Sequence, residues 1–162
     1  MSGAARPRVP RAVAVTGTGG SLLVLYGVIP ALVGRRDRRV GWRNARPGPS
    51  NRWGLVLIGL GTAGLGWCLV SHFEPGQTVE LSLTPPTLLA TGPYRFSRNP
   101  MYVCEQSVLV GWSVLFGSPL VLQGAVALGA AMRYAVGREE RTLRSRFGES
   151  WEDYARRVRR WI

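Results

Sequence analysis

The sequence predicts an all-α integral membrane protein, a helical bundle of about four transmembrane helices. Three observations support this fold class. Residues 12–33 and 53–73 carry no formal charge, a further apolar region over residues 101–136 is broken near its middle by a turn, and the basic residues gather between these segments. At about 1.5 Å per helical residue, roughly twenty residues cover the hydrocarbon core of a bilayer.

Composition excludes several other classes of protein. The chain has 162 residues, a length typical of one domain, and we expect residues 1–162 to form a single unit. Its formal net charge is +12, and all 21 basic residues are arginine. A hydrophobic content of 46% excludes intrinsic disorder. Charges clustered between uncharged segments argue against a soluble nucleic-acid-binding protein, so we expect no nucleic-acid partner.

The first two membrane helices are expected at residues 12–33 and 53–73. Because Arg11 and two further arginines precede the first of these, a signal peptide is an alternative interpretation. The apolar region is too long for a signal peptide, and Arg35 and Arg36 follow it as a stop-transfer flank. We therefore predict a membrane anchor.

The third apolar region predicts a helical hairpin. Gly117, Ser118 and Pro119 form the turn, and Pro119 suits the first position of a helix because its missing N–H is not needed there. The expected helices span about residues 100–116 and 119–136. Each is close to the short limit for a full crossing. The many glycines and alanines of these segments suit close helix packing in lipid.

The arginine distribution bears on orientation. Four crossings place both termini and the loop of residues 74–99 on one side, with 13 arginines, whereas seven arginines between Arg35 and Arg52 lie on the other. The positive-inside rule favours the terminal side as cytoplasmic. Seven arginines are many for the opposite side, and a re-entrant or interfacial first segment would remove that conflict.

Metal binding is not expected. Cys68 and Cys104 both lie in apolar stretches, and His72 is the only histidine. These residues make neither a disulfide framework nor a set of metal ligands.

A polar, turn-rich loop precedes the helical hairpin. Gly-Pro and Asn-Pro pairs break regular structure, and arginines and tyrosines supply hydrogen-bond donors beside the membrane. The loop is a candidate cofactor seat, although interfacial tyrosine and arginine also serve as simple anchors. Its candidate binding residues are Gly92, Pro93, Tyr94, Arg95, Arg98, Asn99, Pro100 and Tyr102.

Two adjacent carboxylates follow the last membrane helix. Glu139 and Glu140 repel each other, and near a membrane they require neutralisation by arginines or by a cationic ligand. Neutralisation by Arg138, Arg141 and Arg144 would make the group purely structural. Binding of a cationic ligand would make it functional.

Glu105 is a second acidic candidate. It lies about one turn into the third expected helix. An ionisable group within a membrane segment is a functional hypothesis by default, because it is costly to retain without a role.

The C-terminal tail predicts further helix. The helix that leaves the membrane is expected to continue through Leu143 and Phe147 and to close at Gly148, and Ser150 with Asp153 forms a capping-box pattern for a new helix. Apolar residues then recur at spacings of three and four, as in an interfacial amphipathic helix whose arginines meet lipid phosphates. These apolar residues are Trp151, Tyr154, Val158 and Trp161.

The ordered set of these motifs resembles the catalytic core of the isoprenylcysteine carboxyl methyltransferase and phospholipid methyltransferase superfamily. The set comprises Thr91-Gly92-Pro93-Tyr94-Arg95, Arg98-Asn99-Pro100-Met101-Tyr102, the apolar hairpin, Arg138-Glu139-Glu140, Leu143, Phe147-Gly148, Tyr154 and Val158. The resemblance covers about residues 88–162, and the first half of the chain offers no comparable match. The familiar second motif is Arg-His-Pro, whereas this chain has Asn99, which forms hydrogen bonds but does not titrate.

The resemblance implies an integral membrane methyltransferase that uses S-adenosylmethionine. It implies that the loop of residues 92–102 forms one wall of a cofactor pocket, with Arg138, Glu139 and Glu140 opposite. In this interpretation Arg98 pairs with a carboxylate of cofactor or substrate, and Glu139 or Glu140 accepts hydrogen bonds from ribose hydroxyls or the amino group. The candidate catalytic residues are Arg98, Glu105 and Glu140.

The resemblance also implies a lipophilic acceptor and a membrane location. The acceptor, a lipid, a prenylated molecule or another lipophilic compound, would enter sideways between helices, in contact with membrane lipids. We expect a bacterial inner-membrane protein whose cofactor site faces the cytoplasm.

Two other functions remain open from the sequence. Some membrane sterol reductases share a similar C-terminal architecture and use NADPH, and the abundant arginines suit a 2′-phosphate. A non-catalytic membrane scaffold would bind anionic lipid through its arginine-rich tails. The acceptor atom and the oligomeric state are likewise open.

Overall fold

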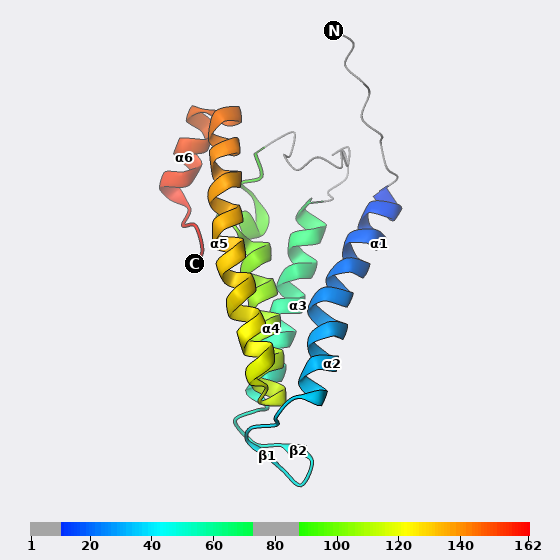
Figure 1. The fold of residues 1–162 in the computed structure, drawn as a ribbon. Helices are drawn as coiled ribbons and strands as arrows, with labels where there is room; N and C mark the ends of the chain where they lie inside the picture. Colours follow the sequence, from blue (N-terminus) through cyan, green and yellow to red (C-terminus); the bar gives the residue numbers. More distant parts are fainter. Residues whose placement is uncertain (1–10, 73–87) are drawn as a thin grey trace.

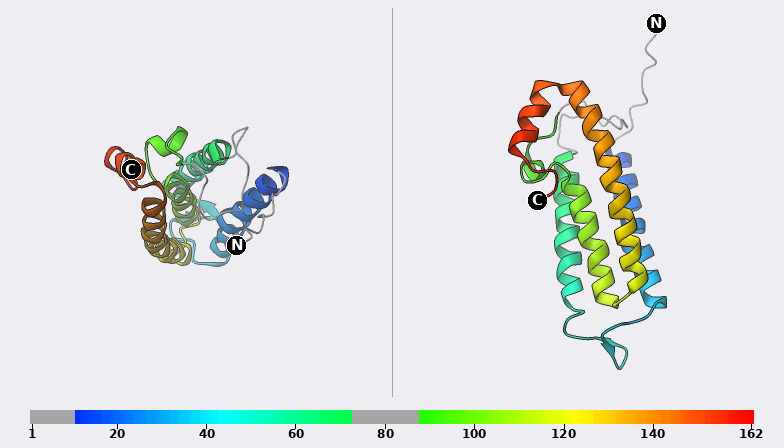
Figure 2. Two further views of the ribbon diagram at one scale, coloured as in Figure 1. Left: turned by 90° about the horizontal axis from the view of Figure 1, so that it is seen from above. Right: turned by 60° about the vertical axis from the view of Figure 1, so that its left-hand side comes forward.

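The computed structural model describes residues 11–72 and 88–162, including the side chains of residues 16–71 and 88–162. Long helices stand side by side, with a small polar hairpin at one end and helix α6 at the other (Figure 1). Helix α4 lies at the centre and contacts α2, α3 and α5. Viewed from above, the long helices form a bundle, and α6 lies at its edge, on the side away from α1 (Figure 2). The predicted all-α membrane bundle is confirmed.

The first membrane segment is one continuous helical run. It comprises α1 (Arg11–Leu22), a π-helical stretch η1 (Leu23–Val28) and α2 (Ile29–Arg36). Residues Thr16–Arg36 are long and apolar enough to cross a membrane. This run is therefore long enough for the predicted membrane anchor.

The remaining long helices match the predicted boundaries closely. They are α3 (Trp53–His72), α4 (Pro100–Phe116) and α5 (Pro119–Phe147). In the part of the chain that the structure describes, Trp53–Ser71 and α5 also meet the length and hydropathy of a membrane span. Helix α4 has only 17 residues, as the sequence suggested. It is held in the bundle by its neighbours on three sides.

The turn between α4 and α5 depends on Gly117. This residue caps α4 in the left-handed conformation with φ of 58°, which L side chains adopt only at a cost. A Cβ atom here would lie 1.9 Å from the carbonyl oxygen of Val40. The Ser118 side chain accepts a hydrogen bond from the Val121 N–H and so caps α5. Glycine is required at this turn for both conformation and space.

Helices α3 and α4 approach closely along a line of small residues. A Cβ atom at Gly54 would lie 2.4 Å from the Gly111 carbonyl oxygen, and one at Gly61 would lie 2.7 Å from the Cys104 carbonyl oxygen. In lipid, where apolar burial alone gives no association, small residues allow helices to pack by direct contact. Gly59 and Gly66 face open space, so only some glycines of this helix serve packing.

The outer surface of the bundle is apolar. Many large hydrophobic side chains are exposed on the first segment, on α3 and on α5. A soluble monomer rarely exposes so large an apolar surface, whereas a membrane-embedded bundle presents it to lipid. These side chains include Leu23, Leu25, Leu32, Leu55, Leu60, Val70, Leu122 and Val126.

The loop between α2 and α3 contains a short ribbon that the sequence analysis did not predict. Strands β1 (Trp42–Arg43) and β2 (Arg46–Pro47) pair antiparallel. The two connecting residues, Asn44 and Ala45, both have positive φ, as in the tight turns that suit a hairpin. The ribbon forms the end of the molecule opposite α6 (Figure 1).

Hydrogen bonds to backbone fix this loop to the bundle. The Asn51 amide donates to the carbonyl oxygens of Val40 (3.1 Å) and Val114 (2.7 Å). The Asp37 carboxylate accepts from the Ser118 hydroxyl (2.6 Å) and from the Leu120 N–H (2.9 Å). A carboxylate at a helix N-terminus is stabilising, because N–H groups there lack partners within the helix.

The C-terminal tail agrees with the prediction only in part. Helix α5 continues to Phe147 as expected, and α6 spans Glu149–Arg157. The predicted capping box is wrong, because Gly148 is the N-cap of α6 and Ser150 lies within the helix. The predicted continuous stripe is also wrong, because the chain is extended at Val158. Backbone groups beyond that point bond to the loop before α4 instead of continuing the helix.

The start of α1 and helix α6 lie at the same end of the bundle (Figure 1). This arrangement agrees with the even number of crossings predicted from the sequence. The loop before α4 lies at this end as well, so the two candidate motifs share one side of the molecule.

Candidate functional site at one end of the bundle

The loop before α4 begins against the end of α3. Residues Gly92–Arg95 form a 3-10 turn, η2, in which Gly92 has φ of 57°. A Cβ atom at Gly92 would lie 2.7 Å from Ser71 Oγ. Pro93 is buried, and the Phe96 ring lies 6.1 Å from the Trp67 ring. The glycine allows the loop to fold tightly onto α3.

The second half of the loop is bonded to the C-terminal segment. The Arg98 N–H donates to the Arg159 carbonyl oxygen (2.9 Å), and the Asn99 side-chain amide donates to the Arg160 carbonyl oxygen (2.9 Å). Ser97 Oγ donates to the same Arg160 oxygen (3.4 Å) and accepts from the Asn99 N–H (3.1 Å). Asn99 therefore acts here as a hydrogen-bonding residue that joins two segments, a role that needs no titrating group.

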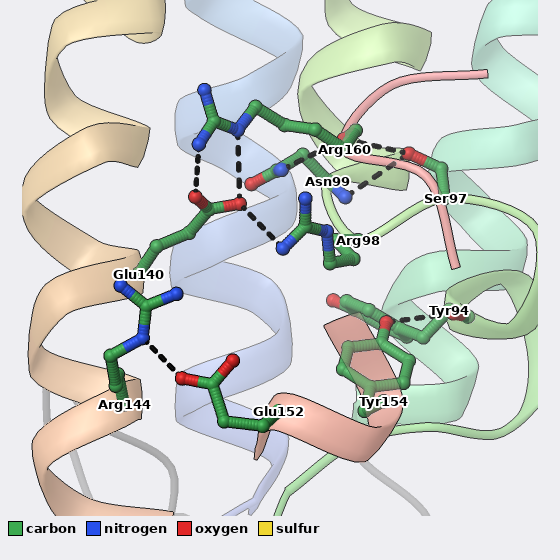
Figure 3. Close-up of polar contacts among 9 residues, drawn as sticks. All are labelled: Tyr94, Ser97, Arg98, Asn99, Glu140, Arg144, Glu152, Tyr154 and Arg160. Atoms are coloured by element: carbon green, nitrogen blue, oxygen red, sulfur yellow. Dashed lines mark hydrogen bonds and ion pairs between the residues drawn. The ribbon is translucent and has the colours of Figure 1, made fainter. Parts of the chain in front are cut away.

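Arg98 and Arg160 converge on Glu140 of α5, as Figure 3 shows. Arg98 Nη1 lies 3.2 Å from Glu140 Oε1, and Arg160 Nε donates to the same oxygen at 3.1 Å while its Nη2 bonds to Oε2. The side chains of Arg98 and Glu140 are only 15% and 13% exposed. We call Arg98, Glu140 and Arg160 the Arg98–Glu140 cluster. It joins the two motifs that the sequence analysis placed on facing walls.

The arginines that neutralise Glu140 differ from those predicted. Arg141 donates to the Gly137 carbonyl oxygen, and Arg144 pairs with Glu152 on the surface. Arg138 is exposed. These side chains project from their own helix, whereas Arg98 and Arg160 come from segments that fold over it. The prediction that the tail arginines meet lipid is thus wrong for Arg160, because its guanidinium donates hydrogen bonds to Glu140. The Glu140 carboxylate also raises the pKa of Arg160.

Two buried donors in this region lack an acceptor. Arg98 Nε and Trp151 Nε1 are both buried, and neither has a hydrogen-bond partner among the residues that the structure describes. The Arg98 guanidinium carbon lies 5.6 Å from the centre of the Trp151 ring, so the two donors belong to one neighbourhood. Buried donors without acceptors are costly, which makes them candidates for ligand contacts.

Tyr154 holds α6 against the loop. Its hydroxyl donates to the Tyr94 carbonyl oxygen at 2.7 Å (Figure 3). Burial raises the pKa of Tyr154 to about 12, although nearby Arg98 acts in the opposite direction. Burial also raises the pKa of Tyr94. Both phenols are therefore protonated at neutral pH, and the Tyr154 hydroxyl acts as a hydrogen-bond donor.

Glu139 lies beside the tyrosines of the loop. Its side chain is half-buried, and it is within electrostatic range of Tyr94 and Tyr102. No ion pair with another described residue accompanies it. Unlike Glu140, Glu139 retains free acceptor capacity for a ligand.

Glu105 makes its contacts elsewhere in the bundle. It is 5% exposed and accepts a hydrogen bond from the Tyr26 hydroxyl at 3.0 Å. The Trp112 indole donates to the Tyr26 carbonyl oxygen at 2.9 Å. This oxygen lacks its usual helical donor, because the residue four positions on is Pro30, which has no N–H. Glu105 thus connects α4 to the first membrane segment and is not bonded to the Arg98–Glu140 cluster.

The other predicted residues take varied positions. Arg95 is exposed and lies over the Phe96 ring, 4.6 Å from its centre. Pro100 begins α4 and is buried. Tyr102 follows within the first turn and is half-buried. Of the predicted arginines, the structure brings only Arg98 into the cluster.

Sequence reasoning missed four contributors to the site. Arg159 and Arg160 bond to the loop, and Trp151 and Tyr154 are 2% and 3% exposed. The spacing of Trp151 and Tyr154 within α6 was a usable signal, because it marked an apolar face. That face was assigned to lipid, whereas it packs inside the protein.

Comparison with known proteins gives an independent result. The family model for phospholipid methyltransferases matches residues 51–150. The match begins before α3 and ends before Trp151. The resemblance was expected only from about residue 88, and the prediction that the first half offers no comparable match is wrong for α3.

Curated relatives cover part of the chain. A nickel-cobalt-cadmium resistance protein of Alcaligenes xylosoxydans xylosoxydans is 34% identical over 65% of this chain and 46% of its own length. A cobalt-zinc-cadmium resistance protein of Cupriavidus metallidurans is 32% identical over 65% of this chain and 45% of its own length. An uncharacterized protein of Haemophilus influenzae is 30% identical over 38% of this chain and its full length.

The chain thus spans under half the length of the two resistance proteins. No solved structure shows a significant match. The family model covers more than half of the chain, including both motifs that meet at the Arg98–Glu140 cluster. The chain belongs to the phospholipid methyltransferase family.

Proposed function

We propose that this protein is a membrane methyltransferase that transfers a methyl group from S-adenosylmethionine to a lipophilic acceptor. One observation carries the proposal: the loop before α4 and the acidic pair of α5 meet in the Arg98–Glu140 cluster, within the segment that matches a methyltransferase family. A scaffold that only binds lipid needs no such convergence of segments far apart in the sequence.

The donors at the site fit one part of the cofactor. S-adenosylmethionine carries a carboxylate, and the buried Arg98 Nε and Trp151 Nε1 are donors without acceptors. An arginine fork favours a carboxylate, since both groups are planar and carry opposite charge. We propose that these two donors hold the carboxylate of the cofactor.

The acidic pair fits another part of the cofactor. Glu139 has free acceptor capacity and suits the cofactor's ammonium or its ribose hydroxyls. Glu140 already accepts from Arg98 and Arg160. We propose that Glu139 contacts the cofactor and that Glu140 positions Arg98.

Methyl transfer from S-adenosylmethionine requires the protein mainly to bind and orient the two reactants. S-adenosylmethionine supplies a methyl group activated on a sulfonium, whose departing thioether is neutral. The protein has to align donor and acceptor and exclude water, and alignment alone lowers a barrier substantially. The C-terminal segment, bonded to the loop through Ser97, Arg98 and Asn99, covers the site and serves this exclusion.

The acceptor is proposed to be lipophilic because the walls of the bundle are apolar and face lipid. It would reach the site sideways, while the cofactor arrives from the aqueous side. Among residues 11–72 and 88–162, no three His, Cys, Asp or Glu side chains gather as metal ligands.

Binding measurements test the proposal. The purified chain in phosphatidylcholine nanodiscs should bind S-adenosylmethionine and S-adenosylhomocysteine in titration calorimetry. The Arg98→Glu variant and the double variant Glu139→Gln, Glu140→Gln should lose this binding and still elute as folded protein.

A surface ion pair supplies the matched control. Glu152→Gln removes the exposed partner of Arg144, and exposed pairs contribute about 0–1 kcal/mol, so cofactor affinity should not change. Folded wild-type protein that binds neither compound would overturn the proposal. Binding of NADPH in competition with S-adenosylhomocysteine would favour a reductase instead.

A further inference from the structure

An open groove of about 370 Å³ lies between α4 and α5, and none of the three residues of the Arg98–Glu140 cluster lines it. Tyr102, Arg133 and Trp161 line the end nearest that cluster, and Val110, Leu122 and Val126 line the rest. At about 1.5 Å per residue, the lining residues extend for roughly 12–16 Å along the two helices. The groove is thus long and apolar, with one polar end.

Arg133 is the unusual member of this lining. It is the only formally charged residue of α5 between Pro119 and Gly137, and this helix is long and apolar enough to cross a membrane. Its side chain is exposed, and no ion pair joins it to a carboxylate in the described part of the chain. An ionisable side chain within a membrane-spanning helix is a functional hypothesis by default, and the positive charge of arginine favours an anionic partner.

The other polar groups of the groove do not neutralise this charge. The Gln106 side chain is occupied by Met132 Sδ at 3.3 Å or, with its amide reversed, by backbone groups of Ala125 and Gly129. Tyr102 and Trp161 offer neutral donors. Among its lining residues, the groove therefore presents one positive charge and two neutral donors at its polar end, beside an apolar stretch.

We propose that this groove binds an anionic amphiphile with a single hydrocarbon chain. A carboxylate or phosphate head group pairs with the Arg133 guanidinium beside Tyr102 and Trp161, and the chain lies along Val110, Leu122 and Val126. Pairing of arginine with such anions is strong and directional. The volume falls within the range of small-molecule sites. This binding does not depend on the cofactor or on methyl transfer.

Quenching of tryptophan fluorescence tests the proposal, because Trp161 lines the groove. The protein is placed in nanodiscs of zwitterionic phosphatidylcholine and titrated with 9,10-dibromostearic acid, whose bromine atoms quench indole at short range. A Trp161→Phe variant identifies the signal of that residue. The neutral methyl ester of the same acid and a brominated lysophosphatidic acid separate charge from chain and carboxylate from phosphate.

The expected result is saturable quenching of Trp161 by one or both of the anionic compounds, at least ten-fold tighter than by the ester. Arg133→Gln should remove this preference, and Arg133→Lys should retain most of it. Gly129→Leu should weaken all binding by filling the groove, since a Cβ at Gly129 meets only the flexible Gln106 side chain, at 3.4 Å. Arg141→Gln, which removes an arginine of α5 outside the groove, is the control and should bind as wild type does.

Equal quenching by acid and ester, or an unchanged preference in Arg133→Gln, would overturn the proposal. Either result would mean that Arg133 reaches the phosphates of the surrounding bilayer instead. Binding of S-adenosylmethionine should be the same in Arg133→Gln and wild type, so the result is independent of the proposed function.

Discussion

The two ends of the bundle are both polar, but they are built differently. At the hairpin end, which comprises residues 37–52 and the turn at Gly117–Pro119, polar side chains bond mainly to backbone groups, as Asn51 and Asp37 do. At the opposite end, charged side chains from three segments bond to one another in the Arg98–Glu140 cluster.

The two ends also leave different atoms without partners. Within residues 16–71 and 88–162, the hairpin end leaves one buried acceptor, Asn51 Oδ1, whereas the cluster end leaves two buried donors, Arg98 Nε and Trp151 Nε1. Bonds to backbone fix the shape of a chain. Ion-paired side chains that also keep unpartnered hydrogen-bond donors can in addition bind a negatively charged ligand. Mutations at the hairpin end should therefore change stability, whereas mutations at the cluster end should change ligand affinity.

The largest expected effect on stability is that of Gly117→Ala at the hairpin end. The left-handed conformation costs about 1–2 kcal/mol for a residue with a Cβ, and the clash with the Val40 carbonyl oxygen adds about 1–3 kcal/mol. Thermal unfolding in detergent should show a marked loss of stability. Gly124→Ala, where a Cβ meets nothing within 4 Å, should be neutral or slightly stabilising. If Gly117→Ala weakened cofactor affinity without lowering the unfolding temperature, the comparison would fail.

The next effect is expected for Trp151→Phe at the cluster end. If the indole N–H donates to the cofactor carboxylate, its loss costs about 1.5–3 kcal/mol, or roughly 10–150-fold in the affinity for S-adenosylhomocysteine measured by calorimetry. Stability should fall only modestly, because the donor is unpaired in the free protein. Trp112→Phe is the matched control, since that indole bonds to the Tyr26 carbonyl oxygen, and it should leave affinity unchanged. Equal affinity of Trp151→Phe and wild type would remove Trp151 from the site.

Tyr154→Phe should have a smaller effect, on stability and on its pH dependence. Loss of the hydrogen bond to the Tyr94 carbonyl oxygen should cost about 1 kcal/mol. The pKa of Tyr154 is raised to about 12 in the folded protein from an ordinary value near 10. Its contribution is therefore full below about pH 10 and is lost as the pH rises through about 12.

Chemical denaturation between pH 8 and 12 measures this effect. The wild type should lose more stability over the alkaline range than Tyr154→Phe. Tyr134→Phe, at a tyrosine that is 70% exposed, should follow the wild-type curve. Parallel curves for wild type and Tyr154→Phe would contradict the assignment.

The smallest effect is expected for Asp37→Asn at the hairpin end. Hydrogen bonds from Ser118 and from the Leu120 N–H lower the pKa of Asp37. The carboxylate therefore contributes stability above its ordinary pKa near 4, and this contribution is lost as the pH falls through the lower folded value. Thermal melts from pH 7 to pH 3 should show less acid sensitivity in Asp37→Asn than in the wild type. Asp153→Asn, on the exposed face of α6, supplies the comparison, and an equal change in both variants would refute the cap.

Much of the fold follows from local pattern. The boundaries of α4 and α5 were predicted from Pro100, the Gly117-Ser118-Pro119 turn and Gly148, because proline and glycine act on the backbone at their own positions. The length of the uncharged segments predicted the first membrane helix and α3 in the same way. The ribbon at β1 and β2 was missed, since strands of two residues leave no periodicity to detect.

The candidate site was only partly predictable. The motifs around Arg98 and Glu140 identified two of its pieces, but not the partners of Glu140. Arg138, Arg141 and Arg144 are near in sequence, and Arg98 and Arg160 are near in space. The segment after Arg157 was expected to remain helical, and its bonds to Ser97 and Asn99 depend on contacts across some 60 residues of chain.

The sequence by itself determined where helices begin and end and which stretches are apolar enough for lipid, because charge, proline and glycine act over a few neighbouring residues. Only the tertiary structure decided which guanidinium meets which carboxylate, which glycines of α3 touch α4, and that the apolar face of α6 packs inward. Those outcomes depend on segments that meet only when the whole bundle has formed, and no local pattern specifies a distant partner.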